Sequence, residues 1–310
     1  MNKVICLDAG ADKFSPLSTI ICYDDFDKGL NGWMDLHPNY VGKNFGTLRF
    51  SQVDKTQWGP IMLSNASFRF AGTHGSMNGT YSLKLATRPY SRPYTEIPEK
   101  GSFSHAIKRL TTHLPEGKRQ FEMWYAYTPE QDRQGLSESA IRAFGIFFDI
   151  QDEEHRYFAG VRYVNAVDDK MVRRWQIFKA KDVTDEEWAY GTQGDWCKKG
   201  IDAMWYGKRY EDGSTDGFEW IEDGYQDLCY NESDDKINWN YLRLVVDTQR
   251  REYVEMQSGN RIFDLRGISP TLTSPYARIK GLFNPGIWVE NNFNRRVFFY
   301  VDSLIISAQS

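Results

Sequence analysis

Four carboxylate residues have the type and placement that acid–base chemistry on a sheet requires. Glu122, Asp149, Glu255 and Glu290 each stand next to an apolar residue in an alternating run, so in a β-strand their side chains would leave the core. A glycoside hydrolase uses two such carboxylates, about 5–5.5 Å apart for retention or about 6.5–9.5 Å apart for inversion. The sequence gives no distance between them, so all four are candidates for a catalytic pair.

The same alternation turns a set of polar and aromatic side chains away from the core. The set consists of His105, Trp124, Arg162, Arg174, Gln176, Tyr241 and Trp288. Aromatic rings stack on the apolar side of a sugar, while Arg, Gln and carboxylate groups form hydrogen bonds with its hydroxyls. The pattern therefore predicts a carbohydrate-binding groove. The alternative is an ordinary solvated face with surface ion pairs, since antiparallel sheets are often wet on one side.

Strands must position these side chains, and eleven segments have the β-branched and aromatic content of strands. They are residues 67–70, 80–86, 104–110, 120–127, 144–151, 156–165, 172–180, 238–247, 253–257, 286–290 and 296–307. Because signals for long helices are almost absent, the sequence predicts an all-β antiparallel sandwich of the jelly-roll type. We expect an N-terminal arm over residues 1–20 and a single domain over residues 21–308.

Residues 181–236 interrupt the strand rhythm and are rich in aromatic side chains. Ten rings lie between Trp188 and Tyr230, with many Asp and Gly residues around them. A loop of this length inside a domain is uncommon and tends to be functional. We expect an aromatic-rich insertion that forms a lid or wall over the groove; the alternative is a self-packed segment that covers a sheet edge or makes a contact in a homodimer.

Composition and charge exclude several classes of protein. The chain has 310 residues, of which 38 are Lys or Arg and 42 are Asp or Glu, which gives a net charge of −4. This balance argues against a protein that binds nucleic acid through the phosphate backbone. The mean hydropathy is −0.60, and no apolar run approaches the roughly 20 residues of a membrane-spanning helix. The sequence therefore predicts neither a nucleic-acid partner nor a membrane partner.

The cysteines and the first residues indicate a reducing compartment. Cys6, Cys22, Cys197 and Cys229 form no C-x-x-C pair, which favours reduced thiols over a zinc site or a disulfide framework. Residues 1–10 contain too few consecutive apolar side chains for a secretory signal. Both observations predict a cytoplasmic protein.

Three motifs carry a resemblance to known families. Residues 24–33 combine an acidic-Phe-acidic start with a Gly-Trp pair, residues 79–85 form a small-Tyr-x-Leu-x-Leu strand, and residues 300–304 end the chain with an acidic strand residue. This outline resembles concanavalin-A-like and carbohydrate-binding-module jelly rolls. The fuller run, with residues 122–127 and 231–236, resembles a bacterial family described as a domain of unknown function, over nearly the whole chain from about residue 20.

The resemblance also implies a metal site. In carbohydrate-binding modules with this outline, the first acidic cluster and the acidic residue of the last strand commonly hold a structural calcium ion. The matching residues here are Asp27 and Asp302, with Asp25 as a neighbour. Ser303 stands where the usual outline has a second Asp, so one carboxylate is lost. Asp residues that cap turns are the alternative explanation.

The functional hypotheses all involve carbohydrate. We expect a jelly-roll protein that recognises an oligosaccharide or other sugar ligand, with glycoside hydrolysis by paired carboxylates as the first hypothesis. A non-catalytic sugar-binding or scaffold protein is the alternative. A polysaccharide lyase is a further alternative, because residues 157–163 resemble a strand of alginate lyases, although the essential Lys is missing. Its chemistry would use Arg162, Arg174, Tyr163 and His105 to neutralise a uronate and move a proton.

Overall fold

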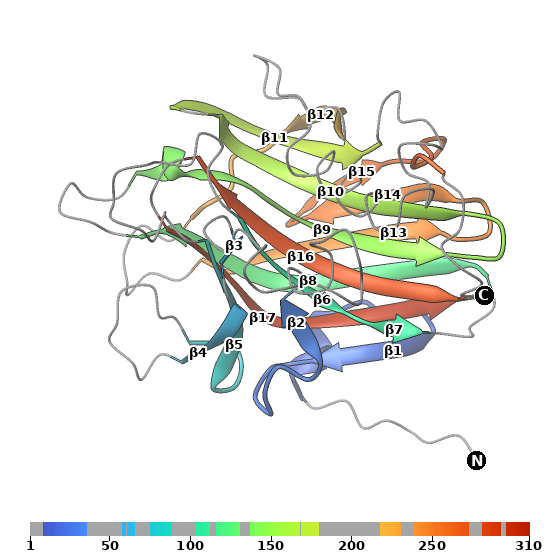
Figure 1. The fold of residues 1–310 in the computed structure, drawn as a ribbon, viewed down its shortest axis with the longest axis horizontal. Coiled ribbons are helices and arrows are strands. Elements are labelled where there is room, and N and C mark those ends of the chain that lie inside the picture. Colours follow the sequence, from blue (N-terminus) through green and yellow to red (C-terminus); the bar gives the residue numbers. More distant parts are fainter. Residues whose placement is uncertain are drawn as a thin grey trace, which may run out of the picture.

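The chain folds into two stacked β-sheets (Figure 1). The computed structural model describes residues 9–35, 58–59, 61–65, 75–87, 103–111, 116–130, 137–167, 169–179, 218–230, 238–272, 281–292 and 296–310. Seventeen strands and two short 3-10 helices, η1 (Ala9–Lys13) and η3 (Glu138–Ala140), lie in these ranges. No helix among these residues is long and apolar enough to cross a membrane.

The first sheet, called here the β8 sheet, has the strand order β15-β14-β13-β8-β17-β5-β4, with β1 beside β17. Its strands are β1 (Thr19–Asp24), β4 (Ile61–Asn65), β5 (Tyr81–Ala86), β8 (Lys118–Pro129), β13 (Asn240–Asp247), β14 (Glu252–Ser258), β15 (Arg261–Asp264) and β17 (Val297–Gln309). The last strand, β17, is central and pairs with β8 along its whole length.

The second sheet, called here the β9 sheet, has the order β12-β11-β10-β9-β16-β6-β2, with β7 beside β16 and β3 beside β6. Its strands are β2 (Trp33–Asp35), β3 (Trp58–Gly59), β6 (Phe103–Lys108), β7 (Leu110–Thr111), β9 (Ile141–Gln151), β10 (Arg156–Val167), β11 (Lys170–Phe178), β12 (Phe218–Tyr225) and β16 (Leu282–Asn291). All strand pairs are antiparallel except the short pairing of β3 with β6. The chain crosses between the sheets several times, for example from β8 to β9 and from β16 to β17, as in jelly rolls.

The core lies between the two sheets and is built from the inward residues of each strand. Tyr125 of β8, Phe144 of β9 and Phe299 of β17 meet at its centre, with ring centroids 5.1–5.2 Å apart. Alternation explains this, because every second residue of β8 and β9 faces the opposite sheet. The aromatic content of the sequence therefore fills a large part of the core.

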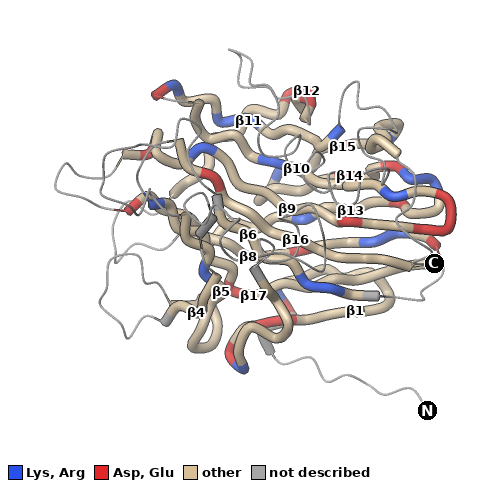
Figure 2. Tube along the Cα trace, in the orientation of Figure 1, with Lys and Arg blue, Asp and Glu red and all other residues tan. Residues whose placement is uncertain are grey.

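The all-β antiparallel sandwich predicted from the sequence is confirmed, and ten of the eleven expected strands are present. The eleventh, residues 67–70, lies outside the described residues. The expected insertion at 181–236 contains one described strand, β12, which pairs with β11 at the edge of the β9 sheet. Figure 2 shows acidic and basic residues interspersed over the described strands and turns, as the near-neutral net charge predicts.

Candidate functional site

The residues expected to share one groove lie on the outer faces of two different sheets. Glu122, Trp124, Tyr241 and Glu255 leave the core from the β8 sheet, where Tyr241 is the register partner of Trp124. The β9 sheet carries the remaining residues of the expected groove, His105, Asp149, Arg162, Arg174, Gln176, Trp288 and Glu290, on its own outer face. The core separates the two sets. The prediction of a single groove that contains both sets of residues is therefore wrong.

The outer face of the β9 sheet carries a buried ionic cluster around Glu290. Arg162 donates to Gln176 Oε1 from Nε at 3.0 Å and from Nη2 at 2.6 Å, and its Nη1 lies 3.4 Å from Glu290 Oε1. Arg142 and the Trp288 indole also contact this carboxylate, at 3.2 Å and 3.0 Å. Burial is the main cause that lowers the pKa of Arg162 to about 10. These groups are held by one another, as buried charges must be.

The other expected residues of this sheet are also engaged. Arg156 binds Asp149 with two parallel hydrogen bonds of 2.8 Å and 2.7 Å. The Arg174 guanidinium lies over the Trp220 ring at 5.0 Å. His105 is fully buried beside its register partner Trp288. The polar side chains of this face were expected to be solvent-facing, and burial corrects that expectation for Asp149 and His105.

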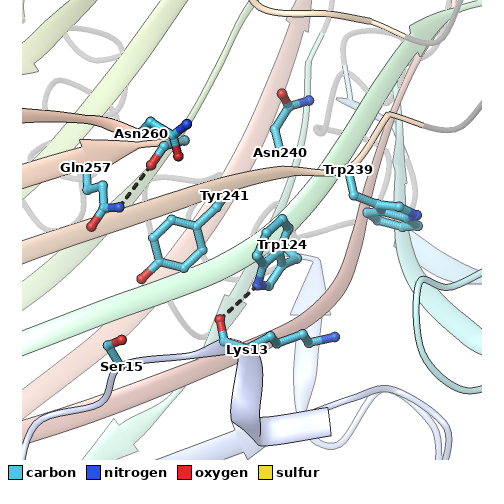
Figure 3. Close-up of a pocket in the computed structure, with 9 residues that line it drawn as sticks. Lys13, Ser15, Trp124, Trp239, Asn240, Tyr241, Gln257 and Asn260 are labelled. Carbon is cyan, nitrogen blue, oxygen red and sulfur yellow. Dashed lines mark hydrogen bonds between the residues drawn. The ribbon is translucent and has the colours of Figure 1, made fainter.

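A pocket of about 340 Å³ lies on the outer face of the β8 sheet. Its lining residues are Lys13, Ser15, Trp124, Trp239, Asn240, Tyr241, Gln257, Gly259 and Asn260 (Figure 3). They come from η1 and the segment after it, from β8, from β13 and the residue before it, and from the end of β14 with the turn that follows. This volume lies at the lower end of the range for small-molecule sites, about 300–1,000 Å³.

Two aromatic rings form the floor of the pocket. Trp124 and Tyr241 are partners on adjacent antiparallel strands, and their ring centroids are 5.4 Å apart at an interplanar angle of 52°. Both side chains are half-buried, which leaves part of each ring open to the pocket. A floor of this kind suits the apolar face of a ring-shaped ligand that also carries polar groups.

One wall of the pocket is the segment that follows η1. The Trp124 indole donates to the carbonyl of Lys13 at 3.3 Å, and the Gln120 amide donates to the carbonyl of Ser15 at 2.8 Å. The backbone N–H of Leu17 donates to Ser307 Oγ at 3.0 Å. These contacts fix residues that are not part of a strand against β8 and β17, so the wall depends on side chains of the sheet below it.

Glu122 lies beneath the wall and is fully buried. Its carboxylate accepts hydrogen bonds from the Ser15 N–H at 2.7 Å, the Gln120 amide at 2.7 Å and the Tyr241 hydroxyl at 2.6 Å. Burial, followed by the Glu122 charge, raises the pKa of Tyr241 well above its ordinary value. The carboxylate therefore joins the wall to the floor and does not face the pocket.

The side chain of Gln257 and the turn that follows it form the opposite rim. Gln257 donates its Nε2 to the carbonyl of Gly259 at 2.9 Å, which leaves its carbonyl oxygen free of donors from the described part of the chain. Asn240 donates its Nδ2 to the carbonyl of Cys229 at 3.2 Å. Glu255 lies beyond this rim and is paired with Arg243. Of the four candidate catalytic carboxylates, none is among the residues that line the pocket.

The carboxylates expected to bind calcium do not fit a calcium site. Asp302 is fully buried, and it accepts the ammonium of Lys13 and the N–H groups of Met77 and Asn78 at 2.6 Å and 2.9 Å. Asp27 accepts the N–H groups of Thr80 and Tyr81 at 2.7 Å and 2.8 Å, and Asp25 accepts the N–H of Asp27 at 3.1 Å. Donors thus occupy both oxygens of Asp302 and Oδ1 of Asp27 and of Asp25, and the buried carboxylate of Asp302 is already paired with the ammonium of Lys13. Within the described residues no three His, Cys, Asp or Glu side chains converge as metal ligands.

Sequence reasoning identified Trp124 and Tyr241 but missed the remaining lining residues. Asn240 lies next to Tyr241 in the run Asn238-Trp239-Asn240-Tyr241, and Gly259-Asn260 is a turn signal between two strands. Lys13 and Ser15 carry no periodic signal, because η1 is a single short turn.

The fold is similar to those of several solved carbohydrate-related structures at low identity. The potassium-bound carbohydrate recognition domain of Emp46p is 8% identical, with 86% of this chain and 95% of that chain covered and a TM-score of 0.38. The Bauhinia forficata lectin in complex with GalNAc is 12% identical, with 90% and 98% covered and a TM-score of 0.36. The alginate lyase vAL-1 from Chlorella virus is 10% identical, with 80% and 93% covered and a TM-score of 0.37.

A comparison with curated proteins finds no match. A family model does match, and it spans residues 1–310 without a gap at either end. The chain therefore belongs to the family described as Domain of unknown function (DUF6772).

Proposed function

We propose that the protein binds carbohydrate in the pocket on the outer face of the β8 sheet and does not cleave it. The observation that carries the proposal is the floor of Trp124 and Tyr241, whose rings are 5.4 Å apart and half-open to the pocket. The amide group of Gln257 lies at the margin of this floor. Ring faces with hydrogen-bonding groups at their margin provide both types of contact that a sugar can make.

The carboxylates support a binding role over hydrolysis. A hydrolase needs two carboxyl groups on either side of the scissile bond. Glu122 is fully buried with three donors on its oxygens, and Glu255 is paired with Arg243. Among the described lining residues, the titratable groups are Lys13 and Tyr241, and each is already bonded to a carboxylate.

The lyase alternative receives less support from the same contacts. Its candidate residues Arg162 and His105 are buried on the β9 sheet, on the far side of the core from the pocket. Arg162 is bonded to Gln176 and Glu290. We therefore retain glycan binding as the proposal.

Binding to an oligosaccharide array, followed by calorimetry with the best ligand, tests the proposal. We expect Trp124→Ala to weaken binding by about 1–2 kcal/mol, which is a roughly 5- to 30-fold higher Kd, because part of the stacking floor is lost. Trp220→Ala is a matched control, since Trp220 is also half-buried but lies on β12 of the other sheet.

Two results would refute the proposal. One is an affinity that Trp124→Ala leaves unchanged, and the other is a loss that only Trp220→Ala produces. Trp124→Ala also removes the indole hydrogen bond to the Lys13 carbonyl. Trp124→Phe loses the same hydrogen bond but keeps a ring on the floor, so it separates the loss of stacking from the loss of that bond. We expect this variant to retain most of the binding.

A further inference from the structure

Among the described residues that line the pocket, the cation is already paired with a carboxylate, whereas a site for anions needs a free positive charge. We infer that the pocket selects neutral, hydroxyl-rich glycans and rejects uronate, sulfated and phosphorylated ones. This inference rests on the proposed function and specifies the ligand class of the same site. It follows from the charges, hydrogen-bond acceptors and buried carboxylate around the floor.

Among the described residues that line the pocket, Lys13 is the single cation, and its charge is already neutralised. Lys13 is the basic residue of the lining, and its ammonium is paired with the buried carboxylate of Asp302. Figure 3 shows the Lys13 side chain extending away from Tyr241. The nearby guanidinium of Arg243 is paired with Glu255. An anionic group in the pocket would therefore be desolvated without a partner charge, which is costly.

The amide rim favours a ligand that donates hydrogen bonds. Gln257 uses one N–H of its NH₂ group on the carbonyl of Gly259, and the indole N–H of Trp124 is used on the carbonyl of Lys13. Within the described residues, no donor reaches Gln257 Oε1, so this oxygen can accept from a ligand. A sugar hydroxyl can donate to it, whereas a carboxylate or sulfate is acceptor-only.

The charge beneath the floor acts in the same direction. Glu122 is fully buried, and its carboxylate is bonded directly to the hydroxyl of Tyr241, one of the two floor residues. A negative charge under the floor repels an anionic ligand, and low-dielectric surroundings strengthen that repulsion. The Tyr241 hydroxyl donates its proton to Glu122, so it cannot also donate it to an anion.

Matched pairs of oligosaccharides test this inference. The probes are hexamers of glucose, mannose and galactose, each compared by calorimetry with the hexamer of the corresponding uronic acid at low and at physiological salt. We expect at least one neutral hexamer to bind at least tenfold more tightly than its uronate. A uronate that binds as tightly as its neutral partner, with a loss in Trp124→Ala, would overturn the inference but leave the proposed function standing. If no hexamer binds, the proposed function itself fails.

A charge-introducing variant provides a second test. Gln257→Lys replaces an acceptor on the rim with a cation that has no carboxylate partner among the lining residues. We expect it to raise the affinity for uronate hexamers at least fivefold at low salt and to lower the affinity for neutral hexamers. Gln249→Lys makes the same change in an exposed turn outside the pocket and should alter neither affinity. An unchanged preference in Gln257→Lys would contradict the inference.

Discussion

Replacing Glu122 with Gln tests whether this residue holds the pocket wall in place or performs acid chemistry. The buried carboxylate accepts three short hydrogen bonds, from Ser15, Gln120 and Tyr241. A Gln side chain can keep its oxygen toward Ser15 and Tyr241, but its NH₂ group then faces the NH₂ group of Gln120. If the Gln120 amide turns to accept, the carbonyl of Ser15 loses its donor.

The magnitude follows from these three bonds. Hydrogen bonds to a charged acceptor contribute about 1.5–3 kcal/mol each, and neutral ones about 0.5–1.5 kcal/mol. Losing one bond and neutralising two others exceeds the relief from removing a buried charge, so we expect a loss of about 2–4 kcal/mol in the free energy of unfolding. With about 2.1 cal/mol/K of unfolding entropy per residue, 310 residues give about 0.65 kcal/mol/K. The melting midpoint should then fall by about 3–6 °C.

Urea unfolding followed by circular dichroism measures this loss, and Glu255→Gln is the matched control. The Glu255 side chain is 34% exposed and is paired with Arg243 on the same outer face, so its replacement should cost less than about 1 kcal/mol. We also expect Glu122→Gln to weaken sugar binding, because the wall at Ser15 loosens. Unchanged stability in Glu122→Gln, together with the loss of a glycan-cleaving activity, would refute the structural role.

Three other properties can be predicted from the structure. Calcium or a chelator should shift the melting midpoint by less than about 1 °C, because donors occupy the oxygens of Asp302. A shift of several degrees would contradict this expectation and indicate that the protein binds calcium. Gly286→Ala should destabilise the fold by about 1–3 kcal/mol, because the new Cβ would lie 2.3 Å from ring carbons of Phe147; an unchanged midpoint in thermal unfolding would contradict this contact. Burial raises the pKa of six tyrosines. Each therefore contributes stability that is complete below its unfolded pKa of about 10 and declines by about 1.4 kcal/mol per pH unit above it, so the free energy of unfolding should fall above about pH 10. The six are Tyr125, Tyr127, Tyr157, Tyr163, Tyr241 and Tyr253. Arg162 and Lys84, whose pKa values burial lowers to about 10 and about 8, and Arg119, whose pKa burial also lowers, oppose this trend, whereas Cys22, whose pKa burial raises to about 12, adds to it. The six tyrosines outnumber the opposing groups, so urea unfolding should show a net decline between about pH 10 and pH 11; a rise there would contradict the burial of these rings.

Alternation along each strand predicted the faces of the side chains well. Phe121, Met123 and Tyr125 point into the core, while Glu122 and Trp124 leave it. The physical reason is local, since a strand turns successive side chains to opposite faces whatever it pairs with. Alternation alone could not predict that Trp124 and Tyr241 are neighbours, because their contact depends on the pairing of β8 with β13, which are separated by more than 100 residues.

The division of the expected groove between two sheets could not be derived from alternation. Alternation tells which residues leave the core, but it does not tell which sheet a strand joins. β8 and β9 follow one another in the chain, yet the connection crosses from one sheet to the other. Glu122 and Asp149 therefore lie on opposite outer faces.

Burial of polar side chains was the other unpredictable feature. Alternation placed Arg162 and Asp149 outside the core in a polar groove, but both are buried and paired. Asp149 pairs with Arg156 of the adjacent strand β10, and Arg162 pairs with Glu290 of β16 in the same sheet. The calcium expectation failed for a similar reason. Lys13, in a short helical turn that carries no periodic signal, supplies the positive charge at Asp302.

A crystal structure of the protein with a neutral oligosaccharide that binds in the array would show directly where the sugar lies. We expect a sugar ring on the floor of Trp124 and Tyr241, with a hydroxyl directed at the carbonyl oxygen of Gln257. A sugar bound instead on the outer face of the β9 sheet, beside Arg162 and Trp288, would contradict this expectation.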